Sequence, residues 1–535
     1  MPTTSPEPVD LAIVGAGPAG LAAAVDAAGL GLNVTLLDAG ERPGGQIYRH
    51  PAPGLGLGEA HPVARRLMRR MGDVRYLPGH HVWTVVRESD GGSEETADGG
   101  GEETTDGGGE ETTDGGGRST CPGHGHSPSH SHGPRRDTAD HTDSGNSENI
   151  RQAAGTWLLH AVVGPEETPA TVRARAVLLA TGAYERQLPF PGWTLPGVVG
   201  AGGAQAMLKS GLVTPGRRTV VAGSGPLLLA VARSLADAGV RVPAVVEAAG
   251  YPAYARHLPA LVRNPGKLAE GVVHGTALLR RTTRLLGRHA VTAAHGTGRV
   301  EAVTVMRLDH DWRPLPGSAR RIPCDALAVG HGLVPQLELA TGLGCATRRA
   351  PDGTPALELD DRQRTSVPGV WAAGETGGIG GAELALTEGR IAALDIARDL
   401  RAAPPRPRTP AAPPGVRPAA LAALSRRRAR LRAFADAMAT AHRPGPGWTD
   451  WLDATTEVCR CEEVPAGRIR QAVSELGAHD ARTVKLLTRA GMGWCQGRMC
   501  GQAVARLAGE DPAPDRRPLS CPVPLRHLAQ PPGAE

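Results

Sequence analysis

The feature that most constrains this chain is a glycine-rich turn near its start. Gly15-x-Gly17-x-x-Gly20 follows a short apolar strand (residues 11–14) and opens an alanine-rich helix, and a second short strand ends just before Asp38. In such a βαβ unit the first glycine permits a tight turn, the second lets the backbone approach a pyrophosphate, and the third allows close helix packing. The helix N-terminus supplies N–H donors for phosphates, and Asp38 can accept a hydrogen bond from a ribose hydroxyl. The sequence therefore predicts a dinucleotide-binding domain.

Two later segments extend this pattern to about residue 400. Thr181 and Gly182 come directly after another buried-looking strand, and the strand at 370–373 leads into Gly374 and Glu375. The arrangement resembles the two-dinucleotide-binding-domain flavoproteins of the glutathione reductase type. The resemblance implies that the first unit binds FAD and that the late glycine–acid pair reaches the flavin ribityl chain. Most members have Asp where this chain has Glu375.

A second glycine-rich turn, Gly223-Ser224-Gly225, departs from the full pattern. Leu228 stands where a third small residue normally lets helix and strand pack closely. Glu247 ends the next strand, as a partner for an adenosine ribose would, and no arginine cluster for a 2′-phosphate follows. Either this domain binds NAD weakly, or it keeps the fold and holds another nucleotide or nothing. We favour the second interpretation.

Four of the eight cysteines form two tight pairs near the C-terminus. The pairs are Cys459-x-Cys461 and Cys495-x4-Cys500. Iron–sulfur clusters need four converging thiolates, and the glycines around the second pair leave room for backbone N–H groups to approach the sulfurs. Zinc is the alternative, but this spacing departs from the usual paired zinc spacing, and we favour the cluster. No Cys-x-x-Cys lies in either nucleotide domain, which disfavours disulfide reductase chemistry.

The cysteine segments CRCEEV and GMGWCQGRMC resemble the bacterioferritin-associated-ferredoxin-like (BFD-like) [2Fe–2S] domain. With PGGQIYR, ATGAYERQLPFPGWTLPGV and GETGGIGGAELALTEG ahead of them, nearly the whole chain resembles one family. That family comprises the larger FAD-containing subunits of bacterial hetero-oligomeric dehydrogenases: the A subunit of opine oxidase, the B subunit of hydrogen cyanide synthase, and the alpha subunit of D-hydroxyproline or proline dehydrogenase. The resemblance adds Gly44 and Gln46, in PGGQIYR, to the expected cofactor-binding residues.

The resemblance implies a function in electron transfer. A smaller partner, itself a D-amino-acid-oxidase-like flavoprotein, would oxidise the C–N bond of an amine, amino acid, imino acid or opine, and this chain would receive the electrons. The sequence shows no obvious acid–base pair for substrate chemistry, so no catalytic residue is predicted. Two alternatives stay open: a self-contained NAD(P)H-dependent reductase of a ferredoxin or other acceptor that uses Gly223 and Gly225, and an iron-handling or regulatory module built on the cysteine domain.

The expected fold class is α/β, with two dinucleotide-binding domains and a small, mainly helical C-terminal [2Fe–2S] domain. Residues 91–117 repeat TDGGGEE and hold nine carboxylates, and residues 121–147 are rich in His, Ser, Pro and Gly, so we expect a disordered insertion there. The expected divisions are 9–90 and 151–215 (FAD-binding domain, first parts), 91–150 (insertion), 216–330 (NAD-binding-like domain), 331–401 (FAD-binding domain, last part), 402–418 (linker), 419–510 (BFD-like domain) and 511–535 (flexible tail).

The remaining features point to no further partner. A net charge of +5 without an aromatic-plus-basic motif does not indicate nucleic acid. Neither a signal peptide nor a membrane span is predicted, so we expect a cytoplasmic protein. The five arginines within residues 426–432 could dock an acidic partner, but a solvated helix face is the interpretation we favour. The histidines of residues 124–132, beside Cys121, likewise fit a polar tract better than a metal site.

Overall fold

The computed structural model describes residues 7–51, 61–88, 155–402, 418–514, 517 and 519–529. The expected insertion at 91–150 lies outside the described residues, as do nearly all of the expected linker and part of the expected tail. None of the helices in the described ranges is long and apolar enough to cross a membrane.

The first domain is built on a seven-stranded sheet of order β3-β2-β1-β6-β5-β4. Its long strand β6 pairs with β5 along its first half and with β19 along its second, while β1 lies on its other side. The strands β3, β2, β1, β6 and β19 run parallel, and the β4–β5–β6 part is antiparallel. The strands are β1 (Val9–Val14), β2 (Val34–Leu37), β3 (Val74–Leu77), β4 (His80–Arg87), β5 (Trp157–Val163), β6 (Thr168–Leu179) and β19 (Val370–Ala372).

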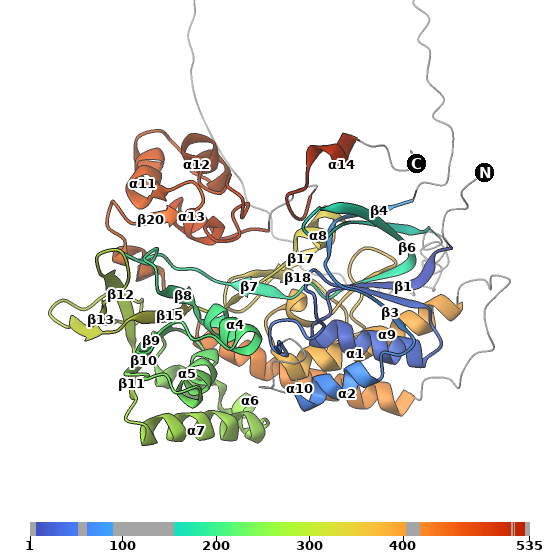
Figure 1. Cartoon of the computed structure of the whole chain (residues 1–535), viewed down its shortest axis with the longest axis horizontal. Coiled ribbons are helices and arrows are strands. Elements are labelled where there is room, and N and C mark those ends of the chain that lie inside the picture. Colours follow the sequence, from blue (N-terminus) through green and yellow to red (C-terminus); the bar gives the residue numbers. More distant parts are fainter. Residues whose placement is uncertain are drawn as a thin grey trace, which may run out of the picture.

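Helices α1 (Pro18–Gly29), α9 (Ala382–Ala402) and α2 (Pro62–Arg69) lie together on one side of this sheet, as Figure 1 shows. The central strands are almost uninterrupted apolar runs because both of their faces are buried. Small residues bring α1 and α9 into close contact: a Cβ on Gly389 would lie 2.2 Å from the carbonyl oxygen of Ala19. The first turn of α1 is thereby fixed between the sheet and α9.

The second domain holds a parallel five-stranded sheet of order β11-β10-β9-β15-β8 and an antiparallel sheet of order β12-β13-β14. The βαβ unit β9–α5–β10 follows the same plan as β1–α1–β2 in the first domain. The strands are β8 (Val198–Gly200), β9 (Thr219–Gly223), β10 (Ala244–Glu247), β11 (Arg284–Gly287), β12 (His289–His295), β13 (Ala302–Arg307), β14 (Arg320–Pro323) and β15 (Ala326–Gly330). The helices are α4 (Ala201–Gly211), α5 (Leu227–Asp237), η2 (Tyr251–His257), α6 (Leu258–Val262) and α7 (Pro265–Arg280).

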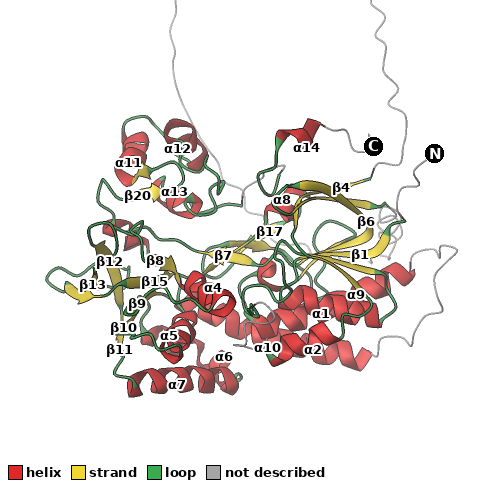
Figure 2. Cartoon of the chain, viewed as in Figure 1, coloured by secondary structure: helices red, strands yellow, loops and turns green. Residues whose placement is uncertain are grey.

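Short elements join the two domains, and Figure 2 shows them as small strands and turns in the middle of the molecule. Two antiparallel pairs form, β7 with β16 and β17 with β18. These elements are β7 (Ala183–Glu185), β16 (Leu333–Pro335), α8 (Glu338–Gly342), β17 (Thr347–Arg349), β18 (Pro355–Leu357) and η3 (Gly374–Gly377). The whole is the α/β fold with two dinucleotide-binding domains that the sequence predicts.

Helix α10 (Pro418–Ala441) packs on the first domain rather than on the cysteine-bearing elements. Leu431 and Ala435 of α10 are buried against Leu384 of α9. The expected division at residue 419 groups this helix with the C-terminal domain. The arginine-rich sequence of α10 does not indicate the apolar stripe that contacts α9. Helix α10 therefore belongs by its contacts to the flavoprotein part.

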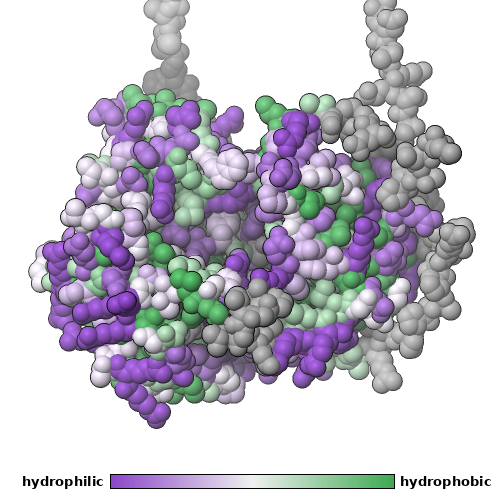
Figure 3. Space-filling view, viewed as in Figure 1, coloured by the Kyte–Doolittle hydropathy of each residue, from purple (hydrophilic) through white to green (hydrophobic). Residues whose placement is uncertain are grey.

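The cysteine-bearing domain packs on the second domain and shares a buried core with it. Trp451 stacks on Trp312, with ring centroids 6.2 Å apart, and Trp193 Nε1 donates to the carbonyl oxygen of Glu457 at 2.7 Å. Figure 3 shows a hollow between the lobe of this domain and the lobe that holds β4 and α14. The elements of the cysteine-bearing domain are η4 (Pro446–Trp451), β20 (Glu457–Cys459), β21 (Val464–Pro465), α11 (Ala466–Ser474), α12 (Ala481–Thr488) and α13 (Gly501–Leu507). The tail that follows holds α14 (Leu525–Ala529).

Candidate functional site

A cavity of about 910 Å³ opens where β1, β6 and β19 end, at the carboxyl edge of the first sheet. Dinucleotides bind at this edge in open α/β sheets. The cavity brings together eight of the expected cofactor-binding residues from five separate segments. They are Gly15, Gly17, Asp38, Gln46, Thr181, Gly182, Gly374 and Glu375.

The glycine-rich turn has the geometry that an approaching pyrophosphate requires. A Cβ on Gly15 would lie 2.3 Å from the carbonyl oxygen of Ala180, and one on Gly20 would lie 1.9 Å from that of Gly15. Apart from Gly17 and its two chain neighbours, no atom of the described residues lies within 4 Å of the Cβ position of Gly17, so a ligand group can reach the backbone there. Gly20 thus serves packing rather than lining the cavity.

Asp38 is held at the cavity by the backbone. Its Oδ2 accepts from the N–H of Ala16 at 2.5 Å, and its Oδ1 accepts from the N–H of Gly40 at 2.6 Å. Burial raises the pKa of this carboxyl group although both N–H groups favour the charged form. Gly44 shapes the next loop: its φ is +127°, and a Cβ there would lie 2.8 Å from the carbonyl oxygen of Tyr48. Together these residues fit the adenosine and pyrophosphate parts of FAD.

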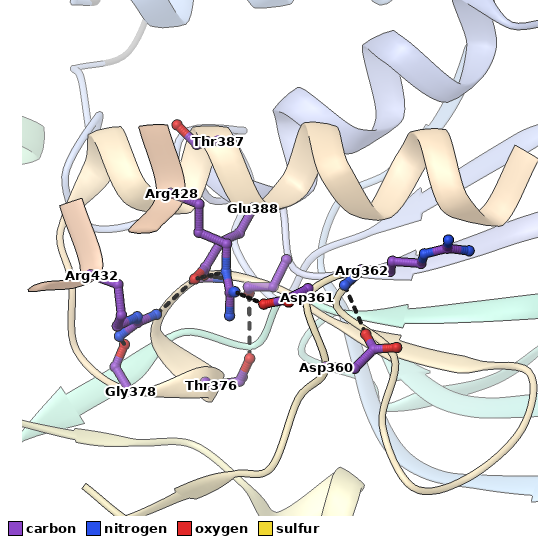
Figure 4. Close-up of polar contacts among 12 residues, drawn as sticks. Asp360, Asp361, Arg362, Thr376, Gly378, Thr387, Glu388, Arg428 and Arg432 are labelled. Carbon is purple, nitrogen blue, oxygen red and sulfur yellow. Dashed lines mark hydrogen bonds and ion pairs between the residues drawn. The ribbon is translucent and has the colours of Figure 1, made fainter. Parts of the chain in front are cut away.

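Two carboxylates hold the loop after β19, and Figure 4 shows one of them, Glu388, extending from its helix toward Arg428 and Arg432. Glu388 of α9 is fully buried, and its Oε2 accepts from the N–H of Gly374 at 3.1 Å. Its Oε1 accepts from Arg432 at 2.8 Å and from Arg428 at 3.2 Å, both on α10. The Arg432 guanidinium also donates to the carbonyl oxygen of Gly378 at 2.8 Å. A buried charge network thus fixes the backbone at the expected flavin contact.

The carboxylate of Glu375 forms hydrogen bonds within the protein. Its two carboxylate oxygens accept from the N–H groups of Gly380 and Gly381, at 2.7 and 3.0 Å, ahead of α9. Burial raises the pKa of this carboxyl group. Glu375 lines the cavity, but both oxygens already have backbone donors, so any contact to a ribityl chain would use their second lone pairs.

The four expected cluster ligands come together as two pairs. Cys459 ends β20, Cys461 follows in the next turn, and the loop before α13 carries Cys495 and Cys500. Cys459, Cys461 and Cys495 all raise the pKa of the Cys500 thiol, so the four sulfurs lie near one another. Within the described ranges no three His, Cys, Asp or Glu side chains form a site for a single metal ion. Four thiols are the ligand set of a two-iron cluster, in which each iron takes two cysteine sulfurs.

The backbone around the first thiol favours its deprotonated form. The hydrogen bond from the Cys500 thiol, together with backbone N–H groups of Gly491, Glu462 and Cys461, lowers the pKa of Cys459 to about 6. Gly491 N lies 3.4 Å from Cys459 Sγ. The interaction with Cys459 also raises the pKa of the Cys500 thiol, so this pair favours one thiolate and one thiol.

Three family profiles match the chain. They are the BFD-like [2Fe-2S] binding domain over residues 457–510, the pyridine nucleotide-disulphide oxidoreductases over residues 142–389, and the NAD(P)-binding Rossmann-like domain over residues 13–87. The HcnB subunit of hydrogen cyanide synthase from Pseudomonas aeruginosa is 34% identical over 91% of this chain and 90% of its own. The A subunit of opine oxidase from Agrobacterium tumefaciens is 31% identical over 93% of this chain and 85% of its own. The chain belongs to the family of HcnB and the opine oxidase A subunits.

The fold of this HcnB-like chain also occurs in a solved structure. L-proline dehydrogenase from P. horikoshii superposes with a TM-score of 0.61 at 18% identity, covering 98% of this chain and 80% of that one. The predictions of a flavoprotein with two dinucleotide-binding domains and a C-terminal BFD-like domain are thus confirmed. The roles of the individual cofactor-binding residues stay predictions.

The second glycine-rich turn of this HcnB-like chain does not share the cavity of the first. Gly223 has φ of +136°, and a Cβ there would lie 1.7 Å from the carbonyl oxygen of Gly330, so glycine is required. The carboxylate of Glu247 accepts from the N–H of Gly225 at 3.0 Å. Beside it stands His442, which follows α10, with Nδ1 3.4 Å from the Glu247 carboxylate.

Sequence reasoning missed Glu388, Arg428, Arg432 and His442. An acidic residue on the buried face of an alanine-rich helix, and two arginines four residues apart, were the available signals for the first three. Arg428 and Arg432 are partly buried against Glu388 rather than on a solvated face, whereas Arg426, Arg427 and Arg430 are exposed. His442 carried no signal, because its partners lie about two hundred residues away.

Proposed function

We propose that this chain is the FAD- and [2Fe–2S]-carrying electron-transfer subunit of a hetero-oligomeric dehydrogenase for an amino acid, imino acid or opine. The observation that carries the proposal is that one chain holds both a cavity shaped for FAD and a paired-thiol site for a two-iron cluster. The relatives are named as subunits of hydrogen cyanide synthase and opine oxidase, which supports a multi-subunit enzyme.

The proposed partner is a smaller D-amino-acid-oxidase-like flavoprotein that oxidises the substrate. When bound, FAD supplies the conversion between a two-electron donor and one-electron steps, and the cluster supplies a one-electron centre. The turn from Gly15 to Gly20 and the carboxylate of Asp38 would hold the dinucleotide. The loop of Gly374, braced by Glu388, would position its flavin end.

The cysteine site has a buried side and an exposed side. Cys459 and Cys500 are 1% exposed and belong to the core shared with the second domain, whereas Cys461 is exposed. Electrons could therefore enter through the packed interior and leave at the surface. The stacked Trp312 and Trp451 at the domain contact exclude water from that interior.

The test is anaerobic absorbance with iron and acid-labile sulfide analysis on the chain co-expressed and co-purified with a smaller D-amino-acid-oxidase-like flavoprotein. Proline, D-hydroxyproline, opines and glycine are added in turn. We expect one of them to bleach the flavin, and about two irons per chain. Replacing Cys495 by Ser should remove the iron. The matched change at Cys345, a buried cysteine outside the cysteine-bearing domain, should leave the iron in place. Bleaching by NADH alone, or zinc in place of iron, would overturn the proposal.

A further inference from the structure

The two βαβ units hold their acidic residues in the same way. In the first, Asp38 accepts from the N–H of Ala16 in the turn and of Gly40 two residues after itself. In the second, Glu247 accepts from the N–H of Gly225 in the turn at 3.0 Å and of Ala249, two residues after itself, at 2.9 Å. A carboxylate supported in this way turns its remaining lone pairs toward the place where a dinucleotide-binding unit receives the adenosine ribose.

The carboxylates of Asp38 and Glu247 have different surroundings. Asp38 lines the cavity of about 910 Å³. Glu247 faces the imidazole of His442, whose Nδ1 lies 3.4 Å from Glu247 Oε1 and 3.2 Å from Ser224 Oγ. The other ring nitrogen, Nε2, lies 2.6 Å from the Tyr254 hydroxyl. His442 is 8% exposed and Ser224 is 3% exposed, so the imidazole covers the turn.

His442 is held in this position from both sides along the chain. On the N-terminal side, α10 is fixed by the contacts of Arg428 and Arg432 with the buried Glu388. On the C-terminal side, Gly445 lies so close to the second domain that a Cβ there would be 2.4 Å from the carbonyl oxygen of Asp311. The imidazole is thus a fixed part of the fold rather than the end of a free segment.

We propose that His442 is a built-in occupant of the second dinucleotide turn and the residue that keeps nicotinamide nucleotides from this chain. An incoming ribose would have to displace a buried ring and replace its hydrogen bonds to Ser224 and Tyr254 and its contact with Glu247. The exclusion of nicotinamide nucleotides from the second turn does not depend on which donor reduces the flavin. Its consequence, that electrons pass between the partner and the cluster without loss to NAD(P)H, rests on the proposed function.

The experiment measures nucleotide binding and flavin bleaching on the purified, flavin-loaded full chain. NADH and NADPH are mixed anaerobically in a stopped-flow instrument, and ADP-ribose is titrated by calorimetry. We expect the wild-type flavin to stay oxidised, and the His442→Ala variant to bind ADP-ribose at least tenfold more tightly. The matched control is His289→Ala, which removes a half-buried histidine of the second domain whose Nδ1 lies 2.8 Å from the nearby Gly287 carbonyl oxygen.

Two results would overturn the proposal. One is a wild-type chain that binds ADP-ribose or is bleached by NADH as readily as the variant. The other is a His442→Ala chain with the flavin content and melting temperature of the control but no gain in ADP-ribose binding. If His442→Ala does not fold, Tyr254→Phe decides, since it removes one anchor of the ring and should raise binding severalfold; no gain there counts against the proposal. Failure of the electron-relay proposal would appear separately, as absence of bleaching by amine substrates through the partner flavoprotein.

Discussion

Replacing Arg432 by Met tests whether helix α10 is part of the flavin site. The substitution keeps an apolar stem of similar length and removes the guanidinium that lies 2.8 Å from Glu388 and donates to the carbonyl oxygen of Gly378. Glu388 would remain fully buried, with only Arg428 at 3.2 Å and the N–H of Gly374 as partners. We therefore expect a destabilised first domain and a loosened Gly374 loop.

The magnitude follows from the burial of the pair. Leaving a buried charge without its partner costs about 3–5 kcal/mol. Arg432 is 14% exposed and Arg428 remains, so we expect a smaller loss of about 2 kcal/mol in the free energy of unfolding. For a domain of this size that corresponds to a fall of roughly 4–8 °C in melting temperature. Retained FAD should fall as well, because Glu388 braces the backbone N–H of Gly374.

The assay is a double-mutant cycle followed by thermal unfolding and flavin content. Its members are wild type, Arg432→Met, Glu388→Gln and the double variant, and Arg426→Met on the exposed side of α10 is the matched control. We expect a coupling energy of about 1–2 kcal/mol between Arg432 and Glu388, and no measurable change in the control. A coupling below about 0.5 kcal/mol, or an equal loss in the control, would refute the reasoning.

Three further predictions concern the cavity and the insertion. Gly15→Ala should lower FAD affinity more than tenfold, since its Cβ would meet a backbone oxygen at 2.3 Å, whereas Gly29→Ala, with open space at its Cβ, should retain FAD; equal FAD content in both would contradict this. Burial raises the pKa of Glu375, so its contribution to stability is present at low pH and is lost as the pH rises through the folded-state pKa. The melting temperature of Glu375→Gln relative to wild type should therefore rise as the pH is raised above the ordinary range of a glutamate carboxyl, and a constant difference would contradict this. Deleting residues 91–147 should leave flavin content and melting temperature unchanged, because β4 and β5 on either side pair directly with each other; loss of either would show that the insertion supports the fold.

The parts of the site that sequence reasoning reached are those set by local geometry. The turn from Gly15 to Gly20 needs glycine because of contacts within one βαβ unit and its neighbouring strand, and that requirement leaves a fixed spacing in the sequence. The two cysteine motifs, Cys459-x-Cys461 and Cys495-x4-Cys500, are likewise local in sequence. The departure at Leu228 marks the second turn as different from the first, and whether that turn binds a nucleotide stays a prediction.

The parts that it missed depend on contacts between distant segments. Ser224 and His442 are 218 residues apart, and neither neighbourhood carries a pattern that requires the other. An arginine-rich helix is usually a solvated one, and the apolar contact of Leu431 with α9 is too short a stripe to show as a helical period. The buried face of α10 is therefore visible only once the fold brings α9 beside it.

Helix α10 and the residue after it act on both dinucleotide units, in opposite ways. At the first unit, Arg428 and Arg432 neutralise the buried Glu388, whose other oxygen holds the loop of Gly374, so the helix supports the cavity. At the second unit, His442 takes the place in front of Glu247, so the same segment closes the turn. Because α10 and the residue directly after it carry both sets of contacts, a chain in which the loop of Gly374 is braced is also one in which the second turn is covered. Conversely, a variant that loosens α10 should both release FAD and let a nucleotide bind at the second turn. Both changes together, rather than either one alone, would show that α10 connects the two dinucleotide units.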